Sequence, residues 1–339
     1  MTTIIPRSLR TTSLYQRISP NPYIHSSHRQ HLSPTQILRH ATSTSTSCTT
    51  SKSTHPVNGP PSTRPAPLST PTRGPDQALP SYLLSLGRSY VTFYKTGIKN
   101  IYTNYRASQP LQSLLDTKYA SCLSAAVKAG ALTRTEFQLL VRNWHDVKRV
   151  PMFALVLLVC GEFTPLVVMA LTSIVPWTCR IPKQIRADRE KLETRRRVSF
   201  RNLTSRLPEK KGVQGLDRMQ LLHISWSLGL SSSAWDWLGG RLPGLPTRIL
   251  RKKVERMVLY LGMDDRLIGK YGGVKEMDIE EVRMALVERG VDILGRDEKQ
   301  LRGELNAWLK SSEQVSTERL LLTRPSAWPT KITGPTLKL

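Results

Sequence analysis

One long apolar segment constrains this chain more than any other feature. Residues 150–179, which lie between Arg149 and Arg180, read VPMFALVLLVCGEFTPLVVMALTSIVPWTC and contain a single charged side chain, Glu162. A straight helix of this length would extend about 45 Å at ~1.5 Å per residue, whereas the hydrocarbon layer of a bilayer is ~30 Å thick. The segment therefore predicts one transmembrane helix, with Trp177 as an anchor at the membrane interface. A buried core helix, interrupted by the prolines of the segment, is the alternative.

Two residues inside this segment are candidates for function. Pro165 has no amide hydrogen to donate to the carbonyl of Gly161, so it predicts a kink close to Glu162. A carboxylate in mid-membrane costs about 2 to 4 kcal/mol, so it needs protonation, a partner in a homo-oligomer or a wet cavity. We therefore interpret Glu162 and Pro165 as a candidate ion or proton pathway. In the alternative, a protonated Glu162 only satisfies the open Gly161 carbonyl or the Thr164 hydroxyl.

The N-terminal 75 residues have the composition of a mitochondrial transit peptide. They contain no Asp or Glu, eight basic residues and many Ser and Thr, and they lack a compact apolar core of the secretory type. A disordered basic tail is the alternative. Residues 41–75 are rich in Ser, Thr and Pro, which predicts a linker or a removed presequence without a fold of its own.

Charge around the apolar segment predicts its orientation. Residues 180–211 carry twelve basic and four acidic side chains, whereas residues 131–150 carry four basic and two acidic ones. The positive-inside rule then places the C-terminal part in the mitochondrial matrix and residues 81–149 in the intermembrane space. The whole chain has a net charge of +25 and a pI near 10.4, which suits an anionic partner such as RNA or an acidic membrane surface.

The flanks of the segment predict helices. In residues 81–108, apolar side chains recur at steps of three and four residues: Tyr90, Phe93, Tyr94, Ile98 and Ile101. Thr133 and Glu136 have the spacing of a capping box, so a helix should begin there and run toward the membrane. His145 and Asp146 precede the segment and predict a solvated pair, with an ion gate as the alternative.

The C-terminal part predicts further helices. Leu250, Val254, Met257, Val258 and Leu261 form one helix face, and the opposite side carries the candidate RNA contacts Arg248, Arg251, Lys252 and Arg256. Residues 277–309 predict two short helices, with the pairs Asp278/Glu281 and Asp297/Gln300 at capping-box spacing and Gly290 at the end of the first. Their inward stripe consists of Leu301, Leu305, Trp308 and Leu309. A basic helix face that is merely solvated remains the alternative to RNA binding.

Nothing in the sequence predicts catalysis. Cys48, Cys122, Cys160 and Cys179 are scattered and predict reduced thiols. We find no metal-ligand spacing, no nucleophile with its base, and no phosphate-binding glycine loop, so we expect neither an enzyme nor a bound cofactor or metal.

Three stretches in order resemble one known family. This is the leucine-zipper, EF-hand-containing transmembrane (LETM) family. Its lead-in to the membrane is similar to ALTRTEFQLLVRNWHDVKRVPMF, and its glutamate-and-proline span is similar to GEFTP. Its matrix ribosome-binding-like domain is similar to DDRLIGKYGGVKEMDIEEVRMALVERGVDILGRDEKQLRGELNAWL. The similarity covers residues 82–310. Its most specific features are an expected turn over Asp265 to Ile268, the Arg289-Gly290 pair and the LRGELNAWL ending. The long coiled coils and the EF-hand of larger members are missing.

This resemblance implies a single-pass inner-membrane protein that supports potassium (monovalent cation)/proton homeostasis and whose matrix domain associates with the mitochondrial ribosome. Its implied partners are the ribosome, inner-membrane lipids, monovalent cations and protons. The alternative is a ribosome tether or translation-support factor without transport activity. The ribosomal RNA contacts of such a tether would include the basic side of the helix near residues 248–256. They would also include the arginines of the juxtamembrane segment, Arg195, Arg196 and Arg197.

The expected fold is therefore all-α. Its parts are a disordered presequence and linker (1–75), an N-terminal helical region (81–149), a kinked transmembrane helix (150–179), a basic juxtamembrane segment (180–211), a helical ribosome-binding-like domain (212–310) and a C-terminal tail (311–339).

Overall fold

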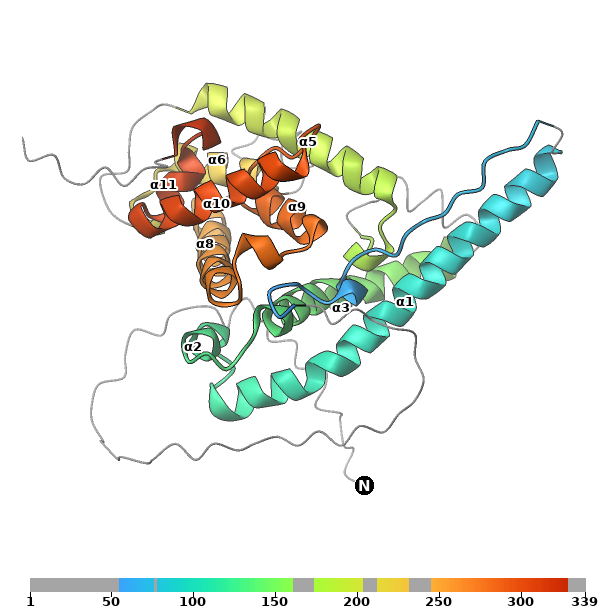
Figure 1. The fold of residues 1–339 in the computed structure, drawn as a ribbon, viewed down its shortest axis with the longest axis horizontal. Helices are drawn as coiled ribbons and strands as arrows, with labels where there is room; N and C mark the ends of the chain where they lie inside the picture. Colours follow the sequence, from blue (N-terminus) through green and yellow to red (C-terminus); the bar gives the residue numbers. More distant parts are fainter. Residues whose placement is uncertain (1–54, 76–77, 161–173, 204–211, 232–244, 329–339) are drawn as a thin grey trace, which may run out of the picture.

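The computed structural model describes residues 55–75, 78–160, 174–203, 212–231 and 245–328 (Figure 1). Within these ranges the chain forms helices and no strand, which confirms the all-α prediction for this part of the protein. The α-helices are α1 (Leu79–Lys118), α2 (Leu123–Lys128), α3 (Arg134–Cys160), α5 (Pro182–Asn202), α6 (Arg218–Ser227), α8 (Thr247–Lys270), α9 (Ile279–Glu288), α10 (Glu298–Gln314) and α11 (Thr317–Leu322). Short 3-10 helices include η3 (Pro61–Thr63), η5 (Trp177–Cys179), η7 (Val274–Glu276) and η8 (Pro325–Ala327).

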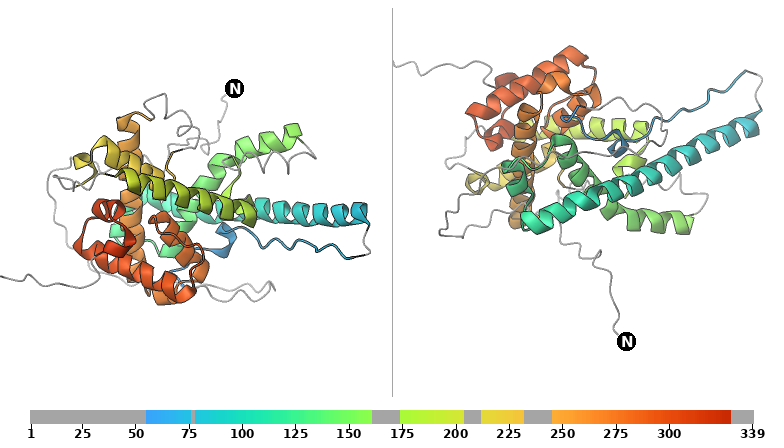
Figure 2. Two further views of the ribbon diagram at one scale, coloured as in Figure 1. Left: turned by 90° about the horizontal axis from the view of Figure 1, so that it is seen from above. Right: turned by 60° about the horizontal axis from the view of Figure 1, so that its bottom comes forward.

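The two longest helices, α1 and α3, pack against each other and run in opposite directions (Figures 1 and 2). The predicted stripe on α1 is partly confirmed, because Phe93 and Ile101 are buried whereas Ile98 is exposed. The predicted capping box at the start of α3 is confirmed: the Thr133 amide donates to Glu136 Oε2 at 2.8 Å, and the Glu136 amide donates to Thr133 Oγ1 at 3.2 Å.

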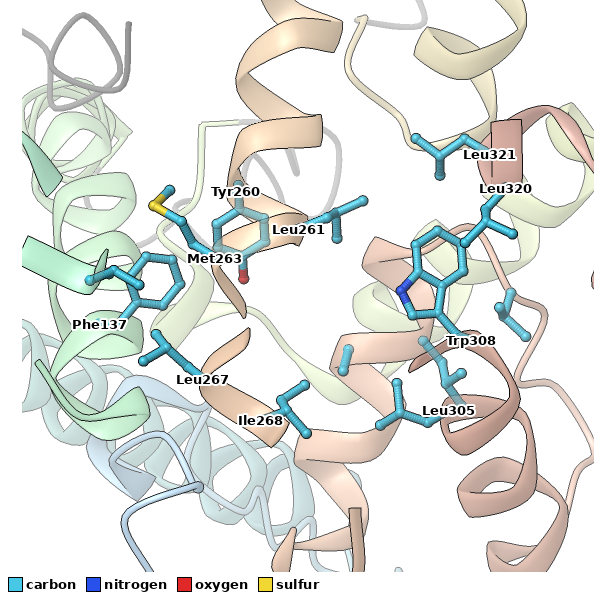
Figure 3. Packing of buried hydrophobic residues seen from close by; sticks show 14 of the residues in the cluster. Phe137, Tyr260, Leu261, Met263, Leu267, Ile268, Leu305, Trp308, Leu320 and Leu321 are labelled. Atoms are coloured by element: carbon cyan, nitrogen blue, oxygen red, sulfur yellow. The ribbon is translucent and has the colours of Figure 1, made fainter. Parts of the chain in front are cut away.

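The main core joins α2 and α3 to the helices from α6 to α11 (Figure 3). Trp308 of α10 is fully buried and meets the ring of Trp328 edge-on, with 5.1 Å between the ring centroids. Phe137 of α3 stacks on Tyr260 of α8 at 5.7 Å. The aromatic side chains therefore connect the region before the apolar segment with the region after it.

Both outer boundaries of the folded part differ from the prediction. The predicted tail from residue 311 begins inside α10, and Leu320, Leu321 and Trp328 are buried, so the fold continues to residue 328. At the other end, Val57 is fully buried in the core, and the Asn58 side chain donates to the Glu276 carbonyl at 2.9 Å and accepts from the Asp278 amide at 2.7 Å. Residues 55–64 are therefore part of the fold, because their polar backbone and side chains find partners in it.

Two local predictions in the C-terminal region failed. Asp278 stands at the N-cap of α9 but makes no side-chain capping bond there, whereas the Asp297/Gln300 box of α10 is confirmed. Asp265 to Ile268, expected as a turn, lie within α8. Gly290 ends α9 as predicted, with a φ of 78° that an L side chain rarely adopts.

The apolar segment is only partly described. Its first residues continue α3 as far as Cys160, while Glu162 and Pro165 lie outside the described residues. The predicted helix does not extend to residue 179: η5 replaces it, and Val175 and Cys179 are buried in a small second core with Phe153 of α3. Across the ranges described above, no helix is both long enough and apolar enough to cross a membrane.

The residues beside the segment also differ from expectation. Asp146 is 2% exposed, and its carboxylate accepts the backbone amides of Trp177 at 2.7 Å and Thr178 at 3.4 Å. The prediction of a solvated His145–Asp146 pair is therefore wrong for Asp146, because this carboxylate holds η5 against α3.

Candidate nucleic-acid interface

A network of buried charges connects the two sides of the apolar segment. Arg134 of α3 donates from Nε to Asp264 Oδ1 of α8 at 2.8 Å and from Nη1 to Glu281 Oε2 of α9 at 3.2 Å. Arg142 of α3 donates from both Nη atoms to the Glu281 carboxylate, at 2.7 and 2.8 Å. Asp264 and Glu281 are fully buried, so these ion pairs are shielded from solvent.

The network extends to the last helices. Arg289, at the end of α9, donates from Nη2 to Asp264 Oδ2 at 2.8 Å and also contacts Asp265. Asp265 in turn accepts from the indole Nε1 of Trp308 at 2.9 Å. A chain of paired charges thus runs from α3 through α8 to α10.

Local positive charge keeps two of these carboxyls ionised. Burial alone raises the pKa of Glu281, but the charges of Arg142, Arg134 and Arg64 outweigh it and lower the pKa to about 2. Burial acts on Asp264 in the same way, and Arg134 and Arg289 lower its pKa well below the usual range. Glu281 and Asp264 are therefore charged at neutral pH, whereas burial raises the pKa of Asp265.

This network does not fit the predicted orientation. A single crossing between residues 150 and 179 would leave α3 on one side of the membrane and α8 and α9 on the other. Buried ion pairs at 2.7 to 2.8 Å between these helices require both to lie on the same side. The placement of 81–149 in the intermembrane space and of 212–310 in the matrix cannot hold together with this fold.

The surface beside the network contains a basic groove of about 540 Å³ between α5, α10 and the segment around η8. Five arginines and three carboxylates line it, so its net charge is +2 with all groups ionised. These side chains are Arg196, Arg197, Arg201, Arg296 and Arg324, with Glu193, Asp292 and Glu304. Phe200 contributes an aromatic ring, and the Arg324 guanidinium carbon lies 5.6 Å from its centroid. We call this feature the basic groove.

The arginines predicted on α5 separate into different environments. The Arg197 side chain is 69% exposed and lines the basic groove, although it also contacts Glu193 at 3.2 Å. Arg196 is buried; it donates to Glu193 Oε2 at 2.8 Å and to the Ser227 carbonyl at 3.1 Å, so its guanidinium serves the fold. Arg195 is half-buried.

The residues predicted on α8 do not line the basic groove. Arg248 and Lys252 are exposed, whereas Arg251 and Arg256 are half-buried. The predicted apolar face of α8 is confirmed, because Leu250, Val254 and Leu261 are buried. The helix therefore offers two exposed basic side chains outside the basic groove.

Sequence reasoning missed Phe200, Arg201, Arg296 and Arg324. Arg201 could have been found, since it follows Arg197 by four residues and so shares its helix face. Arg324 could not, because it lies in a region expected to be a tail. Within the described ranges, no group of His, Cys, Asp and Glu could hold a metal ion.

Two family models match the chain. The pentamidine resistance factor domain matches residues 80–270, which is more than half of the chain, and the LETM1-like, RBD model matches residues 241–327. The chain belongs to the LETM family. The first match includes both sides of the apolar segment, from α1 to the end of α8. Membership indicates a mitochondrial protein with a ribosome-binding-like domain. Comparison with curated proteins and with solved structures gave no match.

Proposed function

We propose that this LETM-family protein binds the mitochondrial ribosome through the basic groove while it is held at the inner membrane. The observation that carries the proposal is the composition of the groove, which lies between α5 and the LETM1-like, RBD region and combines exposed arginines with an aromatic ring. Basic side chains bind phosphates, and aromatic rings stack on unpaired bases, so this composition suits single-stranded segments of ribosomal RNA.

The geometry favours a ribosome tether over a potassium/proton exchanger. Exchange through Glu162 requires this carboxyl to lie on a path across the membrane, whereas both flanks of its segment belong to one body. A role in cation/proton homeostasis rests on family membership and on Glu162 and Pro165, which lie outside the described residues.

Co-sedimentation of the full-length chain with mitochondrial ribosomes tests the tether. We expect Arg197→Gln with Arg201→Gln to weaken binding and to lower the dependence of log K on log salt by about 1 per lost phosphate contact. The matched control is Arg186→Gln with Lys191→Gln, which removes two exposed charges from the same helix outside the basic groove. Equal binding by the groove variant and the control would refute the proposed surface.

A further inference from the structure

Exposed apolar side chains are concentrated at one end of the molecule. Ten of the thirteen large apolar side chains exposed in the described ranges lie on α1 and α3. On α1 they include Leu83 and Leu84, near the N-terminal end, and on α3 they include Leu155, Leu158 and Val159, near the C-terminal end. Leu158 is 84% exposed and Val159 is 75% exposed, the two highest values in this group. Both helix ends project from the same side of the body (Figure 2), and we call this side the apolar end.

Cationic and aromatic residues lie at the base of the apolar end. The Lys148 ammonium is 5.2 Å from the ring of Trp144, and the Arg180 guanidinium is 5.4 Å from the ring of Trp177. Lys183, at the start of α5, is exposed just beyond Arg180. Tryptophan with Lys or Arg is the typical composition of the interface between lipid and water. Arg180 is 13% exposed and pairs with Asp188, so the exposed ammonium groups of Lys148 and Lys183 are the charges that attract anionic headgroups.

The two flanks of residues 161–173 meet in one small core. Phe153 on α3 and Val175 before η5 belong to the same small core, and 21 residues lie between them. Two helical passes through the hydrocarbon layer would need about 20 residues each. Twenty-one residues are thus too few to cross the hydrocarbon layer and return to the same side.

We propose that the apolar end inserts into one leaflet of an anionic membrane and that the body stays on the side from which it enters. The protein is then monotopic rather than single-pass. Lipid fits this surface better than a second copy of the chain, because two bases rich in Lys and Arg would repel each other whereas anionic headgroups neutralise them. The inference rests on the proposed membrane location but does not depend on ribosome binding.

Vesicle flotation of the full-length chain tests the insertion. We expect flotation with vesicles that contain an anionic phospholipid and weaker flotation with phosphatidylcholine alone. Leu158→Glu should reduce the partition coefficient at least about tenfold, which corresponds to about 1.4 kcal/mol. Met219→Glu is the matched control, because Met219 is also exposed, at 54%, but lies on α6. Unchanged flotation of Leu158→Glu would overturn the inference, as would a wild-type chain that dimerises through this end without floating. Circular dichroism verifies that both variants are folded.

Protease added outside these vesicles tests the sidedness. We expect cleavage on both flanks of the apolar segment, with the segment itself left in the membrane fraction. A protected fragment that contains the whole of either flank would show a crossing and would overturn the monotopic arrangement. Ribosome co-sedimentation is measured without vesicles, so failure of one proposal is distinguishable from failure of the other.

Discussion

Replacement of Glu281 with Gln should strongly destabilise the fold. The Glu281 carboxylate is fully buried and accepts two bonds from Arg142 and one from Arg134, while Arg64 lies 3.2 Å away. The substitution keeps the shape of the side chain but removes the carboxylate that forms the ion pair with Arg142. Removal of one partner from a buried ion pair costs about 3 to 5 kcal/mol, because the other charge remains buried without compensation.

Glu280 provides a matched control on the same helix. Its side chain is 37% exposed and contacts Arg189 at 2.9 Å and Arg283 at 3.2 Å near the surface. Glu280→Gln should lower the free energy of unfolding by less than about 1 kcal/mol. Urea denaturation followed by far-ultraviolet circular dichroism measures both variants. If Glu281→Gln loses no more stability than the control, the buried network does not hold α3 to α9.

Three further predictions can be tested. The Glu281 pKa is lowered from its ordinary value of 4.5 to about 2. The contribution of the Glu281 carboxylate to the free energy of unfolding is therefore complete above pH 4.5 and is lost as the pH falls toward 2. Urea unfolding of the wild-type chain should show this loss, and Glu281→Gln should show less of it. Removal of residues 1–64 should lower the thermal midpoint below that of a chain without residues 1–54, because Val57 and Asn58 contact the core; equal midpoints would contradict the packing of this segment. Glu162→Gln should impair potassium-driven swelling of mitochondria if the protein exchanges cations, and unchanged swelling would remove that role from Glu162.

The sequence was a good guide wherever the signal was local. Helical periodicity predicted α1 and α8, and capping-box spacing predicted the starts of α3 and α10, because these patterns depend on residues three or four positions apart. The Asp278/Glu281 spacing has the same form, yet Glu281 pairs with Arg142, which is 139 positions away in the sequence. No local pattern identifies such a partner.

The predicted single crossing of the membrane was not confirmed, for a related reason. Apolar character and flanking charge show that residues 150–179 avoid water, but they do not show where the chain goes afterwards. Val175 is buried beside Phe153, and the Asp146 carboxylate accepts hydrogen bonds from the backbone amides of η5, so this part of the chain packs on α3. The basic groove could likewise be predicted only in part. Its α5 arginines lie in a conspicuous run of basic residues, whereas Arg324 lies in a segment without such a run.

Cross-linking in intact mitochondria tests most directly whether both flanks form one body on one side of the membrane. Lys128 and Lys270 are exposed, and α2 packs against α8. A Cβ atom built at Gly130, two residues after Lys128, would lie 2.8 Å from the Lys270 ammonium, so a short amine-reactive cross-linker can join the two lysines. We predict recovery of a peptide pair that joins Lys128 to Lys270. Both lysines modified separately, in different compartments and never joined, would contradict the account.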